Sequence, residues 1–204
     1  MEDNFKLIRH VIERMSTLGY ISPSDIPEID LYMDQVTTFM DTHLETSKRY
    51  PEDKILTKTM INNYAKNKLL PSPKKKKYSK DHMLMLIFIY YLKNILSISD
   101  IETLLAPLSN QYFNDGSSIS LSEIYTVLME FEQEEQKHLF KDIKERFLVV
   151  NKFFPDLPKE DQEELRIFAY ICTLAFDVYI KKQVIETLID ELKERREKKS
   201  KDEK

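Results

Sequence analysis

Apolar residues recur at helical spacing along most of the chain. Phe5, Ile8 and Ile12 begin a stripe with a period of 3.6 residues, which predicts an amphipathic helix over residues 4–18. We therefore expect an all-α protein. Similar stripes predict further helices over residues 29–46, 57–67, 80–96, 99–108, 120–154 and from 159 to near the C-terminus, and the helix over 120–154 is expected to be kinked or broken.

Two segments carry apolar residues on nearly every side. One covers residues 80–96, and we expect it to be the central buried helix of its domain. The other, Leu165–Ile180, is too hydrophobic for a helix with one wet side, so it must be covered nearly all round. Three interpretations of it stay open: plain core, a homodimer interface, and an aromatic pocket lined by Phe168, Tyr170, Phe176 and Tyr179.

Prolines and polar residues divide the helices into three parts. Pro71 and Pro73 end the helix over 57–67, and the lysine run after them is expected to form a small hairpin that closes at Tyr78. Pro107 is expected to end the helix that contains it, and the polar stretch that follows is expected to be a linker. The resulting parts are an N-terminal helical arm over residues 1–27, a central domain over 28–108 and a C-terminal helical domain over 109–204.

Glycine is scarce, since only Gly19 and Gly116 occur. Walker loops, dinucleotide-binding fingerprints and the glycine elbow of a nucleophilic serine need closely spaced glycines, so these sites are excluded. Folds with many tight β-turns are disfavoured for the same reason. Hydrophobic residues make up 42% of the chain and charged residues 32%, as is typical of a globular protein.

The sequence shows no catalytic or metal site. The histidines lie in separate segments without the spacing of zinc ligands, at His10, His43, His82 and His138. Cys172 is the only cysteine and lies in an apolar segment, where an inert buried thiol is expected. We therefore expect no enzyme, no catalytic residue, no metal and no cofactor.

The chain carries no feature of an exported or membrane-spanning protein. Its first residues include acidic side chains where a secretory signal needs positive charge. The longest nearly apolar run, Met83–Leu92, has ten residues, about half the length that crosses a bilayer. We expect a cytoplasmic protein with no membrane partner.

Basic charge is concentrated in one short window. The formal net charge of the chain is −4, yet residues 54–80 contain nine lysines and no acidic residue. The remaining residues then hold 22 basic and 35 acidic side chains. A local cluster of this kind in an otherwise acidic protein is typical of a surface that contacts phosphates.

The helix expected over 57–67 has two distinct faces. At 100° per residue, Met60, Ile61 and Tyr64 fall on one half of the helical wheel, while lysines, a threonine and asparagines fall on the other. Lysine supplies positive charge to phosphates, and asparagine can pair with adenine through two hydrogen bonds. An ordinary solvated helix face mixes acidic with basic residues. Because this polar half has no acidic residue, its composition favours contact with a nucleic acid over simple exposure to solvent.

Residues 57–105 resemble the winged helix-turn-helix of the MerR family of bacterial transcription regulators. The likeness rests on Tyr64 and the Leu-Leu-Pro exit after it, on the basic run that ends at Tyr78, and on the serine-led helix further along. The chain departs from that family's pattern at Asn62, where the family usually has arginine, and at Lys68, where it has glycine. The resemblance implies a DNA-binding central domain whose wing is the lysine-rich hairpin.

A second and closer resemblance extends from Ile29 to the C-terminal helices. The segments DLYMDQVTTFM and ILTKTMINNYAKNKLLP are similar to the uncharacterised bacterial family known as domain of unknown function 1836. That resemblance implies a MerR-like DNA-binding fold and no particular ligand or operator.

We expect a DNA-binding transcriptional regulator that forms a homodimer through its C-terminal helices, with double-stranded DNA as partner and a small-molecule effector as a further candidate. The alternative is a helical protein-interaction module whose lysine-rich surface binds an acidic protein. The residues assigned to DNA contact are Lys58, Thr59, Asn62, Asn63, Tyr64, Lys66, Lys74, Lys75, Lys76, Lys77 and Tyr78.

Overall fold

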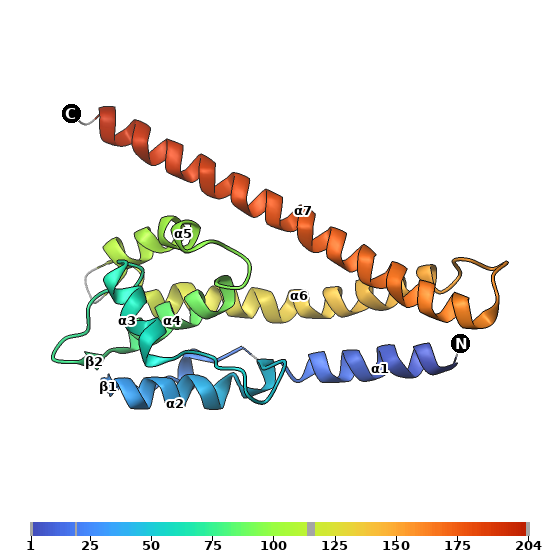
Figure 1. The fold of residues 1–204 in the computed structure, drawn as a ribbon. Helices are drawn as coiled ribbons and strands as arrows, with labels where there is room; N and C mark the ends of the chain where they lie inside the picture. Colours follow the sequence, from blue (N-terminus) through green and yellow to red (C-terminus); the bar gives the residue numbers. More distant parts are fainter. Residues whose placement is uncertain (1, 19, 114–116, 203–204) are drawn as a thin grey trace. The chain divides into compact units, whose positions relative to one another are not determined.

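The computed structural model describes residues 2–18, 20–113 and 117–202, with the side chains of residues 2 and 3 excepted. These residues contain seven α-helices and one two-stranded antiparallel sheet (Figure 1). The expected all-α class is therefore confirmed, with a small sheet added. Gly19 and Gly116 lie outside the described residues.

The chain forms two compact units, each built from two separate segments. Unit 1 consists of Met1–Leu18 and Glu130–Ile185, and unit 2 of Gly19–Met129 and Glu186–Lys204. Two long helices, α6 (Leu121–Val150) and α7 (Lys159–Asp202), each contribute to both units. The three-part division expected from the sequence, into residues 1–27, 28–108 and 109–204, stays a prediction.

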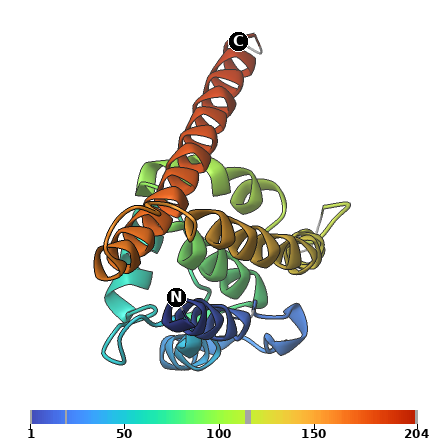
Figure 2. The same cartoon turned by 90° about the vertical axis from the view of Figure 1, so that its right-hand side faces the viewer.

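Unit 2 is organised around α4 (Lys80–Leu92). The helix lies between α2 (Met33–His43) and α5 (Ile98–Gln111), with α3 (Lys58–Lys66) beside it (Figure 2). Its surroundings confirm the prediction of a central buried helix, and each of its aliphatic side chains contributes about 1.5–3 kcal/mol by leaving water. The buried residues of α4 are His82, Met83, Leu84, Met85, Leu86, Ile87, Ile89 and Tyr90.

The sheet joins the start of unit 2 to the lysine run. Strand β1 (Leu31–Tyr32) pairs with β2 (Lys77–Tyr78) in antiparallel register, with Leu31 opposite Tyr78 and Tyr32 opposite Lys77. Two short 3-10 helices, η1 (Pro23–Asp25) and η2 (Glu45–Ser47), flank β1 and α2 along the chain. The sheet fixes the lysine run against the N-terminal end of α2.

Helix α5 corrects one expectation, because it continues through Pro107 to Gln111. A proline inside a helix removes the hydrogen bond to the carbonyl four residues earlier, here that of Thr103. Arg196 of α7 supplies a replacement, because its Nη1 atom donates to the Thr103 carbonyl at 2.5 Å. The predicted helix end was wrong because a guanidinium distant in sequence satisfies the freed carbonyl.

Unit 1 packs α1 (Glu2–Ser16) and parts of α6 and α7 around a small apolar core. Ile8, Phe147, Val150 and Tyr170 form that core. The Tyr170 hydroxyl donates to the Ile143 carbonyl at 2.8 Å, which ties α7 to α6 within this unit.

Helix α6 is continuous, whereas the sequence predicted a kink or a break. The polar stretch over residues 132–138 consists largely of Glu, Gln and Lys, which are strong helix formers even where no apolar face is buried.

In the described part of the chain we find no helix with an apolar stretch sufficient to span a bilayer.

Candidate functional site

Helix α3 presents an acid-free polar face to solvent. The Thr57 side chain caps the helix by accepting the backbone N–H of Met60 at 3.1 Å. Ile61 and Tyr64 point into the core of unit 2 and are buried. The outward face carries the exposed residues Lys58, Thr59, Asn62, Asn63 and Lys66, as the helical wheel predicted.

The end of α3 is a Schellman motif with a lysine in the glycine position. The Leu69 N–H donates to the Tyr64 carbonyl at 2.9 Å, and the Lys68 N–H donates to the Ala65 carbonyl at 3.2 Å. Lys68 has a φ of 60°, in the left-handed region that glycine occupies without steric penalty. The motif turns the chain so that Leu69 and Leu70 are buried.

The segment between α2 and α3 is held by side chains at the C-terminal end of α4. The Ser47 side chain hydrogen-bonds the Tyr90 hydroxyl, and the Lys93 ammonium donates to the Ile55 carbonyl at 2.6 Å. The same ammonium lies 5.0 Å from the centre of the Tyr90 ring. Burial lowers the pKa of Lys93. These contacts set the position of the α3 N-terminus, and no signal in the sequence singled out Lys93.

The lysine run forms a two-residue hairpin turn with Lys75 and Lys76 at its tip. The Lys77 N–H donates to the Lys74 carbonyl at 2.9 Å. Lys75 and Lys76 have φ values of 51° and 63°, so both central residues are left-handed, as a type I′ turn requires. This hairpin is the one predicted from the sequence. The Lys77 ammonium lies 5.2 Å from the centre of the Tyr32 ring on the paired strand.

Two of the candidate residues are buried beneath this surface. Tyr64 is 6% exposed and Tyr78 is 3% exposed, so neither can contact a macromolecule as predicted. Tyr64 was on the apolar half of the helical wheel, and Tyr78 faces the core because its neighbour Lys77 takes the outer face of the strand. Both tyrosines support the surface from below.

His82 links the hairpin to the start of α4. Its Nδ1 atom accepts the backbone N–H of Ser79 at 3.0 Å, and its ring packs edge-to-face on Tyr78 and Phe113 at 5.5 and 4.7 Å. Burial lowers the pKa of His82, because the charged ring would lose its hydration. The neutral ring therefore serves as the acceptor that caps α4.

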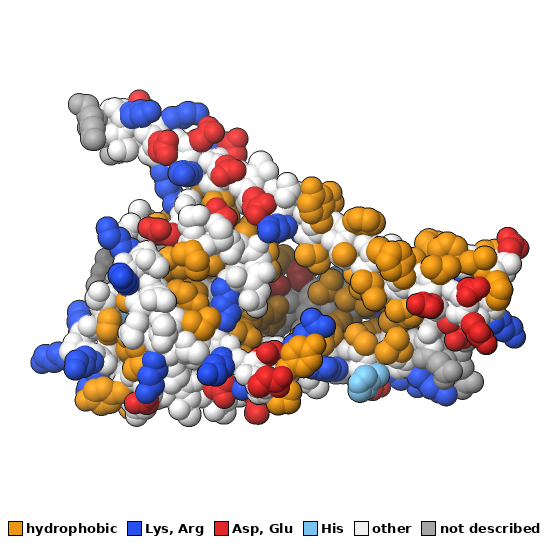
Figure 3. Space-filling view, viewed as in Figure 1, with side chains coloured by type: hydrophobic (Ala, Val, Ile, Leu, Met, Phe, Trp, Pro, Cys, Tyr) orange, Lys and Arg blue, Asp and Glu red, His pale blue; other side chains and the backbone are white. Residues whose placement is uncertain are grey.

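The lysines of this site differ in their ionic partners. Lys58 pairs with Asp34 of α2, and Lys80 pairs with Glu28 at 2.5 Å. Among the residues that the structure describes, the exposed lysines of α3 and the hairpin other than Lys58 form no ion pair. Lys and Arg side chains gather at the end of unit 2 that holds α3 and β2 (Figure 3). We name this surface, made by Lys58, Thr59, Asn62, Asn63, Lys66 and Lys74 to Lys77, the lysine face.

Much of the apolar segment Leu165–Ile180 of α7 is exposed within a single copy of the chain. Phe168, Phe176 and Tyr179 are exposed, whereas Tyr170 is buried against Phe147, so these four side chains do not line a common pocket. Cys172 is half-buried and not buried as expected. Within the described residues, no group of His, Cys, Asp and Glu is arranged to hold a metal ion.

Comparison with known proteins gives a family and nothing more specific. No curated protein and no solved structure matches the chain. Residues 21–128 match the family described as domain of unknown function (DUF1836), a range that contains α2, α3, the hairpin, α4 and α5. Because this match covers more than half of the 204 residues, the chain belongs to the DUF1836 family.

Proposed function

We propose that this protein is a DNA-binding transcriptional regulator whose central domain is a winged helix-turn-helix of the MerR kind. In this proposal α2 and α3 are the two helices of the motif, α3 is the recognition helix, and the hairpin over residues 74–78 is the wing. The order β1, α2, α3, hairpin, α4 supports the assignment, because β1 pairs with the hairpin strand and α2 packs against both α3 and β2.

The observation that carries the proposal is the conformation of Lys75 and Lys76. Both occupy left-handed positions, where Asn-Gly or Gly-Gly is favoured in a two-residue turn. A left-handed conformation costs an L-residue about 1–2 kcal/mol. Placing two lysines there brings positive charge to the tip of the hairpin at a steric penalty, and strain of this kind concentrates at functional sites. Positive charge at an exposed hairpin tip suits a polyanionic partner.

The composition of the lysine face favours DNA over an acidic protein. Asn62 and Asn63 lie on the exposed face of α3 beside its lysines. Lysines alone would suit either partner, because each supplies a point charge to phosphates or to carboxylates. Asparagine adds a paired donor and acceptor that match the major-groove edge of adenine. We therefore assign phosphate contacts to the lysines and base contacts to the asparagines.

We further propose that α7 joins two copies of the chain. Its exposed residues Leu165, Phe168, Ala175, Phe176 and Tyr179, with the half-buried Cys172 among them, follow a 3-4 spacing that forms one apolar stripe, the arrangement of a helix–helix seam. Hydrophobic side chains gather along this part of α7 (Figure 3).

The size of the exposed apolar area supports a second copy as the occupant. Phe168, Phe176 and Tyr179 are 62%, 67% and 58% exposed. At about 150–250 Å² per aromatic side chain, these three alone present on the order of 350 Å². With the aliphatic neighbours, the stripe exceeds the few hundred Å² of a typical monomer and approaches the roughly 800 Å² per partner of a stable interface. A dimer is also the form in which helix-turn-helix proteins bind two DNA half-sites.

Light scattering at tens of micromolar tests the dimer. Replacing Phe176 by Glu should give a monomer, because an unpaired charge in the interface would cost several kcal/mol. Ile29→Glu is the matched control, since Ile29 is 70% exposed in unit 2 and should leave the mass unchanged. A monomeric wild type would contradict the dimer.

A competition experiment separates DNA from an acidic protein as the partner. Labelled duplex DNA bound to the full chain is displaced with unlabelled duplex or with polyglutamate of equal charge. Stronger displacement by the duplex supports the proposal, and the preference should weaken in Asn62→Ala/Asn63→Ala. Equal or stronger displacement by polyglutamate would instead identify an acidic protein as the natural partner.

A further inference from the structure

We propose that a groove between α1 and α6 in unit 1 binds a small amphipathic molecule that carries one anionic group on an apolar body. The groove has a volume of about 380 Å³, within the range of small-molecule pockets. It lies wholly in unit 1, far in sequence from the lysine face, and the inference does not depend on DNA binding.

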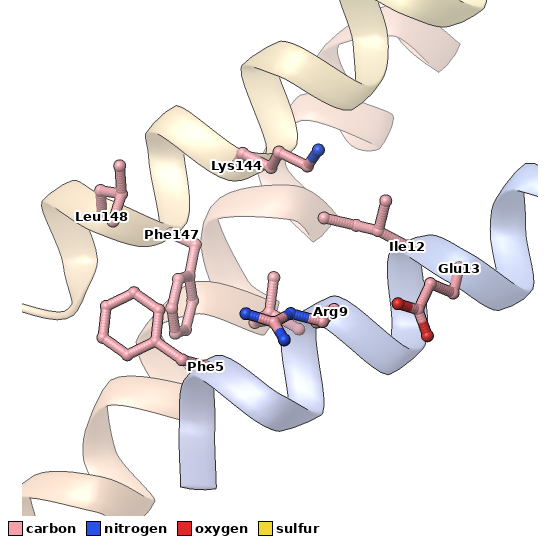
Figure 4. Close-up of a pocket in the computed structure, with 8 residues that line it drawn as sticks. Phe5, Arg9, Ile12, Glu13, Lys144, Phe147 and Leu148 are labelled. Atoms are coloured by element: carbon pink, nitrogen blue, oxygen red, sulfur yellow. The ribbon is translucent and has the colours of Figure 1, made fainter. Parts of the chain in front are cut away.

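The walls of the groove are apolar and aromatic. Phe5 of α1 and Phe147 of α6 meet edge-to-face with ring centres 5.3 Å apart, and both line the groove. Ile8, Ile12 and Leu148 complete the apolar lining. The two phenyl rings lie at one end of the groove and Ile12 at the other (Figure 4). An apolar, preferably aromatic, ligand body would bury these side chains, of which Leu148 is 49% exposed.

The charged residues of the groove leave an excess of positive charge. Arg9 comes from α1 and Lys144 from α6, so the groove receives one cation from each wall (Figure 4). In the described residues neither cation forms an ion pair, although Glu13 follows Arg9 by one helical turn and also lines the groove. Two cations that line one apolar cavity favour an anionic ligand there over a neutral or cationic one.

Charge complementarity therefore selects the class of ligand. Arginine can bind a carboxylate through two parallel hydrogen bonds, and a lysine from the other wall would add a second charge-assisted contact. A neutral apolar compound would satisfy the aromatic wall and leave both cations as they are. A dianion would bring more charge than the groove can pair, because Glu13 lies beside Ile12 in the same groove (Figure 4).

The test uses two probes of nearly equal shape, 1-naphthylacetate and its neutral amide. Calorimetric titration of the full chain should show saturable binding of the carboxylate with one molecule per chain, and binding of the amide at least tenfold weaker. Thermal unfolding should shift upward with the carboxylate, since a ligand that bridges α1 and α6 binds only the folded unit.

Three variants locate the binding. Arg9→Gln/Lys144→Gln should weaken carboxylate binding at least tenfold and leave amide binding unchanged. Lys137→Gln/Lys141→Gln, which removes two exposed cations of α6 outside the groove, should change neither. Leu148→Trp should abolish binding of both probes by filling the groove from its exposed rim. Three results would overturn the proposal: equal binding of the two probes to the wild type, carboxylate binding that Arg9→Gln/Lys144→Gln leaves unchanged, and binding of either probe that persists in Leu148→Trp.

Discussion

Replacing Lys75 and Lys76 by Asn and Gly should make the protein more stable and a weaker DNA binder at the same time. The change keeps the two-residue turn, because Asn-Gly is the favoured sequence of a type I′ turn. It removes two positive charges from an exposed tip where the structure has φ values of 51° and 63°. A strained functional turn predicts a gain in stability together with a loss of DNA affinity, whereas an ordinary loop predicts neither.

The size of each effect follows from the geometry. Relief of two left-handed lysines at about 1–2 kcal/mol each is partly offset by the greater chain entropy of glycine in the unfolded state, roughly 0.5–1 kcal/mol. A net gain of about 1–3.5 kcal/mol in the free energy of unfolding is expected. For DNA, the plot of log K against log salt should become shallower by about 1.8 per protomer, since each lost phosphate contact contributes about 0.9.

The assay combines urea unfolding, followed by circular dichroism, with fluorescence anisotropy of labelled duplex DNA between 50 and 200 mM salt. Lys152→Gln/Lys193→Gln is the matched control, because it removes two exposed charges outside the lysine face and should change neither quantity. A variant that is less stable than the wild type would refute the strain argument. A more stable variant with unchanged DNA affinity and salt slope would refute the role of the turn in binding.

Three further predictions concern base contact, the proline-containing helix and pH. Asn62→Ala and Asn63→Ala should reduce discrimination between specific and random duplexes by about 1–3 kcal/mol per lost paired contact, and equal losses on both duplexes would show that α3 does not contact bases. Arg196→Ala should lower the free energy of unfolding by about 1.5–3 kcal/mol. The loss should be much smaller in a Pro107→Ala background, because residue 107 then regains an N–H for the Thr103 carbonyl. A double-mutant cycle of unfolding energies measures this coupling, and additivity of the two changes would contradict it. Burial lowers the pKa of His82 below its value in the unfolded chain. The contribution of neutral His82 to the free energy of unfolding should therefore be complete above about pH 6.5. It should decline as the pH falls toward the lower folded pKa, by at most about 1.4 kcal/mol per pH unit. Urea unfolding at pH 7.5 and 5.5 should thus show a larger loss for wild type than for His82→Gln, and equal losses would exclude this role.

The sequence was informative wherever a single element determined the outcome. The apolar run over residues 83–92 could only be a buried helix, and the faces of α3 followed from the spacing of Ile61 and Tyr64 alone. The lysine hairpin was also predictable, because Pro71 and Pro73 exclude a helix there. The left-handed lysines could not be foreseen, since a turn type depends on the strand that it pairs with.

Contacts between distant segments account for what the sequence did not reveal. The helix through Pro107 needs Arg196, and the placement of α3 needs Lys93 at the Ile55 carbonyl. Neither partner lies near its acceptor in sequence, so no local pattern marks it. The burial of Tyr78 was missed for the same reason, because β2 pairs with β1 from the start of unit 2.

The salt dependence of duplex DNA binding tests the central proposal most directly. Full-length protein is titrated with mixed genomic duplexes at 50, 100 and 200 mM salt, and log K is plotted against log salt. If the lysine face neutralises six to ten phosphates in the dimer, affinity should fall by about 10³ to 10⁵ across this range, and the slope should become shallower in Lys75→Ala/Lys76→Ala. Absence of binding at 50 mM salt, or an affinity that salt does not change, would contradict the proposed function.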